Sequence, residues 1–545
     1  MKKYLLICVL TFIVFSCNTD DYPQEPEQFY LLQFKVADHV GGFDFYNVNT
    51  NPDIQISFSV APDLLSAQQN IQLLKGATVV PVNMVYSAIN DSIIIISPVS
   101  KLNKETKYIV QVLPGLLSKK QTKLNSAITA AVVTEIDSSI KFPLITDEAL
   151  LTLIQQQTFK YFYDFAHPSS GMARERNTSG DIVATGGSGF GIMALIVGME
   201  RGFISRAEGI ARLTKILNFL STCDQFHGAW PHWINGSTRK VVPFSTKDNG
   251  GDLVETSFMA QGLITMRQYL NASVQEEKTL IDLINSLCNA IEYDWYTRNQ
   301  NVLHWHWSPN YGWDMNMQLK GYNETLITYI MAASSTTHTI SQDVYKTGYA
   351  RNGDIRNGKQ YYGITLTLGE DYGGPLFFTH YSFLGLDPTN LKDEYADYWE
   401  QNVNHTKINH AYCVANPRHH FGYGEDCWGL TASDIPKGYT ASSPTNDRGV
   451  IAPTAAISSL PYTPSESMKA IRFYYYVLGK HLWKDYGFVD SFSLNEMWFA
   501  DSFLAIDQGP QIVMIENYRT GLLWDLFMSA PEIQSGLTKL GFSYK

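Results

Sequence analysis

Four separated stretches of the sequence combine carboxylates with aromatic rings and glycines. They span residues 174–191, 230–257, 305–324 and 423–449. Hydrolysis of a glycosidic bond requires one carboxylic acid to protonate the leaving oxygen and a second carboxylate to activate water or attack the anomeric carbon. Flat Trp and Tyr faces cover the apolar faces of pyranose rings. The four stretches therefore predict a sugar-binding cleft with hydrolytic chemistry.

Three carboxylates are the candidates for catalysis: Glu255, Asp447 and Asp181. Glu255 falls in the first turn of a predicted helix whose other residues are almost all apolar or small. The helix dipole alone would favour a carboxylate there. Burial at the mouth of such a helix would also raise its pKa, as a general acid requires. Asp447 precedes another apolar helix, where it either caps the helix or serves in catalysis, and Asp181 is a base, a ligand contact or a loop staple.

Further residues of the four stretches are predicted to contact sugar. Tryptophan is also a frequent core residue, so we expect only about half of the loop tryptophans to reach a ligand. The predicted substrate-binding residues are Glu425, Arg174, Trp230, Trp233, Trp313, Tyr322, Tyr423, Trp428, Arg448 and Phe190.

No cofactor or metal is predicted. The glycine-rich run 186–191 lacks the Lys of a phosphate-binding loop and the GxGxxG spacing. Cys413 and Cys427 bracket two histidines, but their spacing fits no zinc pattern. Buried thiols or one disulfide remain open for the cysteines of the folded body.

The charge balance argues for an uncharged partner. The formal net charge is -11, which disfavours nucleic acid because phosphate binding relies on Lys and Arg. Polysaccharide lyases act on uronates and need basic clefts. A neutral glucan is the more natural ligand, bound by a monomer.

The first residues are typical of a bacterial lipoprotein signal. A charged start, Met1 to Lys3, precedes an apolar stretch at residues 4–15 that is too short to span a bilayer, and Cys17 follows Ser16. The context of Cys17 resembles the lipobox and predicts that residues 1–17 are a signal peptide, with lipid on the Cys17 thiol. The alternative is an ordinary secretory signal with an incidental Cys. We expect an exported lipoprotein, periplasmic or on the outer membrane or cell surface, held to the membrane by this anchor alone.

Three segments follow the signal. Residues 18–28 are a polar tether with two prolines. Residues 29–136 show short alternating runs, at 54–60, 92–97 and 107–113, that predict a small all-β sandwich. Residues 102–110 resemble bacterial immunoglobulin-like domains. Residues 137–145 form a linker.

Residues 146–545 have helical periodicity. Ser205 with Glu208, Ser273 with Glu276, and Thr463 with Glu466 match capping boxes at helix starts. Helices at 205–221 and 273–291 carry charge on one face, whereas those at 189–198 and 254–266 are nearly free of charge. This alternation of outer and inner helices predicts an all-α domain of the (α/α)6 type.

Several motifs in one order resemble a known family, the putative glucoamylase-like domain that includes glycoside hydrolase family 144, the β-1,2-glucanases. They are GGSGFG at 186–191, GDLVET at 251–256, GEDCWG at 424–429, DQGP at 507–510 and ENYRTG at 516–521. The resemblance implies an (α/α)6 barrel and an inverting mechanism. It also implies Glu255 as general acid, Asp447 as base and Asp181 in the cleft. The expected substrate is β-1,2-glucan, cut internally or with release of sophorose.

Two other functions remain open at this point. The chain could be a surface glycan-binding lipoprotein that has lost catalysis, although a binder has no need for so many carboxylates. It could also be a polysaccharide lyase, since lyases use helical toroids and the chain holds 32 tyrosines. Release of reducing sugar identifies a hydrolase, and absorbance from a new double bond identifies a lyase.

Overall fold

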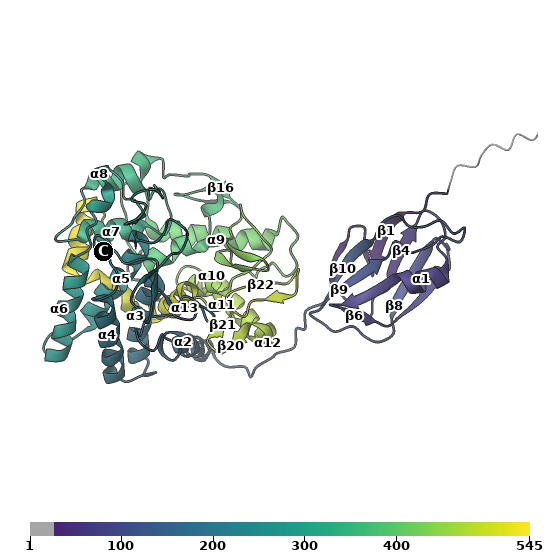
Figure 1. The fold of residues 1–545 in the computed structure, drawn as a ribbon, viewed down its shortest axis with the longest axis horizontal. Coiled ribbons are helices and arrows are strands. Elements are labelled where there is room, and N and C mark those ends of the chain that lie inside the picture. Colours follow the sequence, from purple (N-terminus) through teal and green to yellow (C-terminus); the bar gives the residue numbers. More distant parts are fainter. Residues whose placement is uncertain (1–26, 545) are drawn as a thin grey trace, which may run out of the picture. The chain divides into compact units, whose positions relative to one another are not determined.

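The computed structural model describes residues 27–544 and divides the chain into two compact units, residues 1–135 and 136–545 (Figure 1). The predicted signal peptide, its Cys17 and most of the predicted tether lie outside the described residues, so these remain predictions. No helix within residues 27–544 is long and apolar enough to cross a membrane.

The first unit consists of two five-stranded sheets, with strand orders β2-β1-β4-β8-β7 and β3-β10-β9-β5-β6. Inward-facing apolar residues alternate with polar ones, as in β4, where Ile54, Ile56 and Phe58 are buried. The immunoglobulin-like sandwich expected from the sequence is confirmed. The strands are β1 Leu31–Val36, β2 His39–Val40, β3 Asp44–Val48, β4 Ile54–Phe58, β5 Ile71–Lys75, β6 Thr78–Val80, β7 Val82–Tyr86, β8 Ile93–Pro98, β9 Lys107–Val112 and β10 Ile128–Thr134.

One helix interrupts this all-β unit. It is α1 (Leu64–Asn70), and the Asp63 side chain accepts a hydrogen bond from the Ser66 N–H at 2.8 Å, which caps its first turn. The period-2 pattern of the flanking strands gave no sign of so short a helix.

The second unit is mainly helical, with small sheets in the connections. The helices are α2 Asp147–Tyr163, α3 Thr185–Glu200, α4 Arg206–Leu220, α5 Leu253–Tyr269, α6 Gln275–Asn289, α7 Leu326–Ser334, α8 Gln342–Val344, α9 Tyr398–Ala415, α10 Pro453–Ser458, α11 Pro464–Arg472, α12 Gly479–Leu482, α13 Ala505–Thr520, α14 Leu522–Met528 and α15 Pro531–Leu540. The connecting strands are β11 Ile182–Ala184, β12 Trp233–Asn235, β13 Val241–Val242, β14 Gly251–Asp252, β15 His306–Trp307, β16 Gln360–Tyr361, β17 Ile364–Thr365, β18 Ala432–Ile435, β19 Gly438–Ala441, β20 Trp483–Lys484, β21 Gly487–Phe488, β22 Phe492–Ser493 and β23 Trp498–Phe499.

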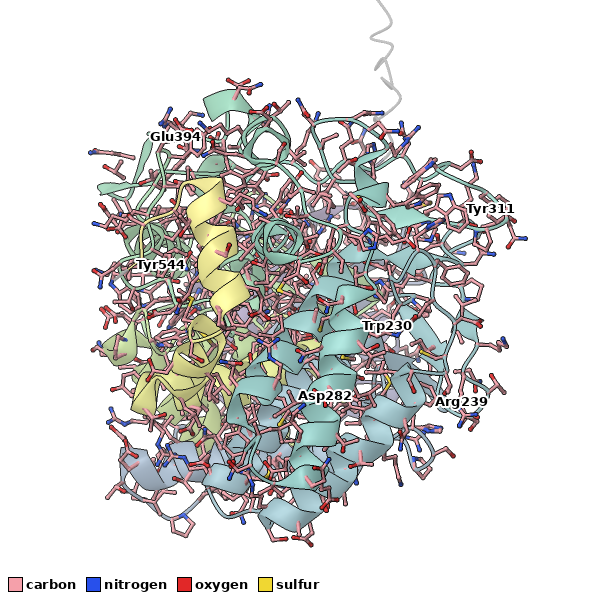
Figure 2. All side chains as sticks on the ribbon, turned by 90° about the vertical axis from the view of Figure 1, so that its left-hand side faces the viewer. Trp230, Arg239, Asp282, Tyr311, Glu394 and Tyr544 are labelled. Carbon is pink, nitrogen blue, oxygen red and sulfur yellow. The ribbon has the colours of Figure 1, made fainter. Side chains whose placement is uncertain are left out.

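Helices α3, α5 and α13 form the centre of this unit. Residues 185–198 of α3 and 253–266 of α5 are all buried, and α3 packs against both α5 and α13. The near absence of charge in α3 and α5 is therefore explained by burial on every side. In contrast, α4 and α6 bury one face and expose the other, and Figure 2 shows α6 on the outside with Asp282. The predicted division into inner and outer helices is confirmed for these four.

Two glycines bring α3 and α5 into close contact. A Cβ on Gly262 of α5 would lie 2.2 Å from the Gly189 carbonyl oxygen of α3. A Cβ on Gly189 would in turn lie 2.4 Å from the Phe258 carbonyl oxygen. Both distances are shorter than van der Waals contact, so the two backbones can only cross at residues that lack a side chain.

The three predicted capping boxes have different outcomes. Ser205 and Glu208 form both bonds of the box at the start of α4. The box at Ser273 is wrong, because α6 begins two residues later with Val274 as its N-cap. At Thr463 the predicted helix start is confirmed, since Thr463 is the N-cap of α11 and Pro464 is its first residue. The box itself is wrong, because the Thr463 hydroxyl caps no N–H group and lies 3.4 Å from the Ser459 carbonyl oxygen.

All four cysteines of the described residues are free thiols. Cys223, Cys413 and Cys427 are buried, and Cys288 is partly buried. The sequence left open whether these cysteines are buried thiols or form one disulfide, and the structure shows thiols.

The Gly189–Gly262 crossing predicts that Gly262→Ala destabilises the helical unit. The added methyl group must push α3 and α5 apart, which costs about 1–3 kcal/mol and exceeds the gain in helix propensity of roughly 1 kcal/mol. Thermal unfolding of the full chain, followed by circular dichroism at 222 nm, measures the shift.

Gly209→Ala in α4 is the matched control. Its new Cβ would meet only the flexible side chain of Met199, so we expect a smaller change in Tm. Equal Tm values for Gly262→Ala and the unaltered chain would contradict the close-contact explanation.

Candidate active site

A cavity of about 310 Å³ opens where α5, α7 and α13 begin. Helix starts present unpaired N–H groups and a positive potential, so carboxyl groups are favoured there. Residues of each chemical type needed for sugar hydrolysis line it: His232, Asp252, Glu255, Phe258, Trp305, Lys320, Asn323, Glu324, Phe377, Tyr381 and Ile506.

Asp252 fixes the first turn of α5. Its Oδ1 accepts hydrogen bonds from the N–H groups of Val254 and Glu255, both at 2.9 Å. Its Oδ2 accepts from the Trp305 indole at 2.7 Å and lies 3.0 Å from His232 Nδ1. This fully buried carboxylate therefore holds the backbone of Glu255 and the ring of His232 in place at the same time.

Glu255 is 7% exposed and faces the start of α3. The Gly186 N–H donates to its Oε2 at 2.6 Å. A Cβ on Gly186 would lie 2.7 Å from the same oxygen, so only glycine allows this contact. Burial raises the pKa of Glu255 to about 7, and the charge of Asp252 adds to the shift, while His232 and the Gly186 N–H act against it. Glu255 therefore carries its proton in much of the population at neutral pH.

His232 is the charged partner of this carboxyl. Burial lowers the pKa of His232, but the carboxylates of Glu255 and Asp252 outweigh burial and raise it to about 9. The ring stacks on Phe244 with centroids 4.3 Å apart. The imidazole is thus a cation at neutral pH and sets the acidity of Glu255 from a fixed position.

A second carboxyl, Glu324, lines the same cavity just before α7. Burial raises the pKa of Glu324 to about 7, and the charges of Asp252 and Glu255 add to the shift. Glu324 precedes the uncharged helix α7, which can be read from the sequence, but it was not among the predicted catalytic residues.

Asp447 lies outside the lining of this cavity, among donors of its own. Tyr423 donates to Oδ1 at 2.9 Å, Tyr412 donates to Oδ2 at 3.0 Å, and the Gly449 N–H donates to Oδ1 at 2.9 Å. His420 Nε2 lies 3.1 Å from Oδ2. Burial acts to raise the pKa of Asp447, but these donors outweigh burial and lower it. Asp447 is therefore an ionised carboxylate at neutral pH.

The other polar residues predicted for the site hold loops together or face solvent. The Asp181 side chain is 57% exposed and pairs with His167 at 3.1 Å. The Glu425 side chain is 68% exposed and pairs with Lys469 at 3.3 Å. Arg174 donates to the carbonyl groups of Phe165 and Gly180, and Arg448 is exposed. None of these four contributes to the lining of the 310 Å³ cavity.

Four predicted aromatic contacts lie in the core. Trp230, Trp428 and Phe190 have no exposed surface, and Tyr322 has almost none. The Trp230 indole donates to the Leu220 carbonyl and the Trp428 indole to the Glu466 carbonyl, so each ring has its polar group satisfied inside the protein. The burial of these rings leaves them no surface for a sugar and corrects the prediction for them.

The remaining three aromatic predictions lie at the surface of the unit. Trp233 packs on Phe244 beside His232, next to the cavity. Trp313 lies over Arg298 in a separate aromatic cluster with Trp295. Tyr423 is the donor to Asp447.

Phe377 and Tyr381 complete the cavity and were not predicted. They belong to the short 3-10 turns Leu376–Thr379 and Tyr381–Phe383, which have no amphipathic period from which to place them. Tyr381 also contacts Asp507 of α13 at 3.4 Å.

Family models and known proteins match both units of the chain. Residues 44–135 match the model described as a bacterial Ig-like domain, and residues 316–531 match the one described as putative glucoamylase. A curated relative, the exo β-1,2-glucooligosaccharide sophorohydrolase of Parabacteroides distasonis, is 46% identical over 445 residues, which are 77% of this chain and 61% of that protein. The match therefore spans less than two thirds of the length of this relative.

Solved structures share the fold of the helical unit. A putative glucoamylase from Bacteroides uniformis is 56% identical, with a TM-score of 0.73, and the match covers 74% of this chain and 99% of that one. The endo-β-1,2-glucanase from Chitinophaga pinensis, solved with sophorotriose and glucose, is 53% identical, with a TM-score of 0.72 and the same coverage of both chains. The chain thus belongs to the family of putative glucoamylases that includes the β-1,2-glucanases of glycoside hydrolase family 144, and it carries an immunoglobulin-like domain before the helical unit.

Proposed function

We propose that the protein is a glycoside hydrolase that cleaves β-1,2-glucan, either internally or with release of sophorose. The observation that carries this proposal is Glu255, a buried carboxyl with a raised pKa that opens into a cavity lined by Trp305, Phe377 and Tyr381. A raised pKa is what a general acid needs at neutral pH. The linkage is supported by two relatives, the β-1,2-glucooligosaccharide sophorohydrolase of Parabacteroides distasonis and the endo-β-1,2-glucanase of Chitinophaga pinensis.

The helices of the second unit are proposed to form an (α/α)6 barrel. Helix α10 contacts α13, α13 contacts α3, α3 contacts α5, and α5 contacts α7. Helix α7 in turn contacts the turn Tyr381–Phe383. His380 Nε2 lies 3.0 Å from Ser459 Oγ just after α10, and the Tyr462 hydroxyl donates to the Thr379 carbonyl at 3.0 Å. These contacts join the last member of the series to the first, which supports a closed inner ring.

The proposed reaction uses two carboxyl groups whose pKa values are shifted in opposite directions. Glu255 donates its proton to the glycosidic oxygen as the bond to the anomeric carbon breaks. Asp447, which the family resemblance implies as base, is kept ionised by its donors and takes the proton of the attacking water. Opposite shifts of this kind separate an acid from a base. Asp447 lies outside the cavity lining. In an inverting enzyme the two carboxyl groups stand far enough apart to accommodate the water.

Glu324 is assigned a different task. Because burial raises its pKa to about 7, it holds a proton in part of the population and can donate a hydrogen bond to a sugar hydroxyl. Asp447 is kept ionised by its donors, whereas Glu324 is ionised in only part of the population.

The two competing functions are less well supported by the cavity. A lyase that binds uronates needs a basic cleft, whereas Lys320 and His232 are the two basic residues of this lining and His232 is paired with Asp252. A protein that only binds glycan gains nothing from an acidic carboxyl held at a raised pKa.

Replacing Glu255 by Gln keeps the shape of the side chain and removes the proton. We expect cleavage of β-1,2-glucan to fall by about a hundred- to ten-thousand-fold. Reducing-sugar release from β-1,2-, β-1,3-, β-1,4- and α-1,4-glucans measures both the loss and the linkage.

Glu200→Gln is the matched control, because Glu200 lies at the other end of α3, where it accepts a hydrogen bond from Tyr269. We expect it to leave the rate within about twofold of the wild type. A folded wild-type chain that releases sugar from none of the four glucans would overturn the hydrolase proposal.

The pH dependence follows from the same pair. Glu255 acts only when protonated, so kcat/KM should fall as the pH rises through its pKa near 7. His232 lowers the pKa of Glu255, so replacing His232 by Asn, which can still donate to Asp252, should move this basic limb to higher pH. Measuring kcat/KM from pH 5 to 10 for both proteins tests the sign, and a limb that stays in place or moves to lower pH is incompatible with the assignment.

The inverting mechanism predicts the configuration of the first product. Attack of water on the face opposite to the leaving oxygen converts the β-linkage into an α-anomer at the new reducing end. Proton NMR in the first minutes of the reaction, before mutarotation, should show the α-anomeric signal grow first. Early growth of the β-anomer would mean retention and would exclude Asp447 as a simple base.

A further inference from the structure

A second hollow of about 400 Å³ lies in the helical unit. Its size falls in the range of roughly 300–1,000 Å³ that is typical of small-molecule sites. Residues from three parts of the chain line it, among them Arg176, Asp434, Tyr439, Trp498 and Ser502. The proposed reaction gives none of them a role.

Tyr439 and Tyr381 connect this hollow to the first cavity. Tyr381 lines the cavity of Glu255 and contacts Asp507, whose charge in turn acts on the Tyr439 hydroxyl. Arg176 pairs through its backbone with Leu504, two residues before Ile506, which lines the first cavity. The start of α13 therefore lies next to residues of both spaces.

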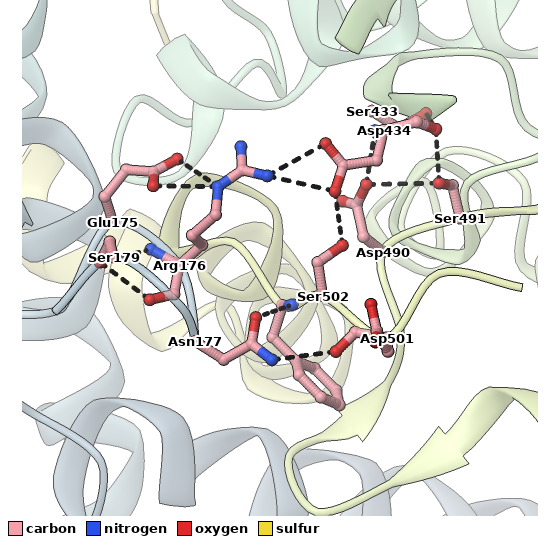
Figure 3. A network of polar contacts seen from close by, with 11 residues as sticks. Glu175, Arg176, Asn177, Ser179, Ser433, Asp434, Asp490, Ser491, Asp501 and Ser502 are labelled. Atoms are coloured by element: carbon pink, nitrogen blue, oxygen red, sulfur yellow. Dashed lines mark hydrogen bonds and ion pairs between the residues drawn. The ribbon is translucent and has the colours of Figure 1, made fainter. Parts of the chain in front are cut away.

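Arg176, which lines the hollow, is held between Glu175 and Asp434 (Figure 3). Its Nε donates to both carboxylate oxygens of Glu175, at 3.1 and 3.0 Å, and its Nη1 lies 3.2 Å from both carboxylate oxygens of Asp434. Nη2 has no partner among the described residues, and the guanidinium remains partly exposed. A donor that is fixed and unused costs little entropy when it binds a hydroxyl group.

Asp434 is fixed as firmly as Arg176. The Ser502 hydroxyl donates to its Oδ2 at 2.5 Å, and its backbone N–H donates to Asp490 Oδ2 at 2.7 Å. The Ser491 hydroxyl donates to the Asp434 carbonyl at 2.6 Å, as Figure 3 shows. Arg176 and Asp434 form the polar floor of the hollow, and their hydrogen bonds hold them in place without a ligand.

Two aromatic rings border this polar floor. Tyr439 stands opposite Asp434 in the β18–β19 hairpin, and it is 49% exposed although burial and the charges of Asp507, Asp490 and Asp434 raise the pKa of its hydroxyl. Tyr439 is thus partly open to solvent. Trp498 of β23 is partly buried and lines the same hollow. An exposed ring on its own needs no explanation, but two rings beside a fixed guanidinium form a platform.

The charges of the hollow select the class of ligand. Arg176, the one basic residue of the lining, is paired with both Glu175 and Asp434, and Asp501 is a second acidic residue of the lining. An anionic ligand would meet more negative than positive charge. A neutral ring with an apolar face and several hydroxyl groups fits both the aromatic rings and the fixed polar groups.

We propose that the hollow formed by Arg176, Asp434, Tyr439 and Trp498 is a second sugar-binding site, which holds a glucose residue of the same glucan chain at a distance from the bond that is cut. The proposal rests on the proposed function and deepens it. It makes the length of the glucan chain, in addition to its linkage, a determinant of the rate.

The test compares linear β-1,2-glucooligosaccharides of increasing length. For the wild type, kcat/KM should rise with each glucose until the hollow is filled. In Tyr439→Ala and in Trp498→Ala, the ratio of kcat/KM for the longest oligosaccharide to that for the shortest one cleaved should fall about tenfold, which is the usual size of the loss at a binding residue that matters. Tyr518→Ala is the matched control, since this exposed tyrosine lies near the end of α13, and its ratio should equal that of the wild type.

The outcomes are distinct for the two proposals. A wild-type chain that cleaves no β-1,2-glucooligosaccharide overturns the proposed function. Cleavage by the wild type with an unchanged length ratio in both aromatic variants overturns the second sugar-binding site alone. An equal loss at every length together with a lowered Tm would show that the two rings are structural, which also overturns it.

Discussion

The helical unit depends on one constraint, which is that a carboxyl group has to be held out of water at the place where two inner helices begin. Glu255 meets this constraint because Asp252 caps α5 and the Gly186 N–H of α3 reaches Oε2. The N–H groups of Glu255 and Gly186 lie in the first turns of α5 and α3, where they would otherwise lack hydrogen-bond partners. Since the folded pKa of Glu255 lies above its ordinary value, this group favours folding at low pH, and its contribution is lost as the pH rises to about 7. The burial that raises the pKa of Glu255 therefore also makes its ionised form unfavourable for folding.

The rest of the scaffold follows from bringing α3 close enough to α5. Gly186 leaves space for the carboxyl, and Gly189 with Gly262 lets the backbones cross. The nearly uncharged surfaces of both helices then pack on all sides, so the positions of the two helix starts are fixed by the core. Acidic residues at neighbouring helix starts, Glu324 before α7 and Asp507 in α13, share the same end of the unit. The carboxyl groups of the cavity lie at this end because the helix starts lie there.

The sequence predicted the parts of this arrangement that are local. The sandwich follows from alternation in short strands, and Glu255 could be selected because its helix is apolar on all sides. Trp230 and Trp428 show the limit of prediction from local sequence. A tryptophan in a predicted loop has the same sequence pattern whether its indole donates to a core carbonyl or faces a sugar. The surroundings of Asp447 could not be predicted from the sequence either, because its donors Tyr412 and Tyr423 are 35 and 24 residues away along the chain. Tyr381 lies in a 3-10 turn without periodicity, so only the folded chain brings it to the cavity.

The assignment of Glu255 as the proton donor is tested most directly by changing the leaving group. An aryl β-sophoroside with 4-nitrophenol as leaving group needs no proton to depart, whereas a glucan does. If Glu255 is the general acid, Glu255→Gln should lose about a hundredfold or more of its rate on β-1,2-glucan and less than about tenfold on the aryl substrate. Equal losses on both substrates would contradict the assignment and would leave Glu255 a residue that only shapes the cavity.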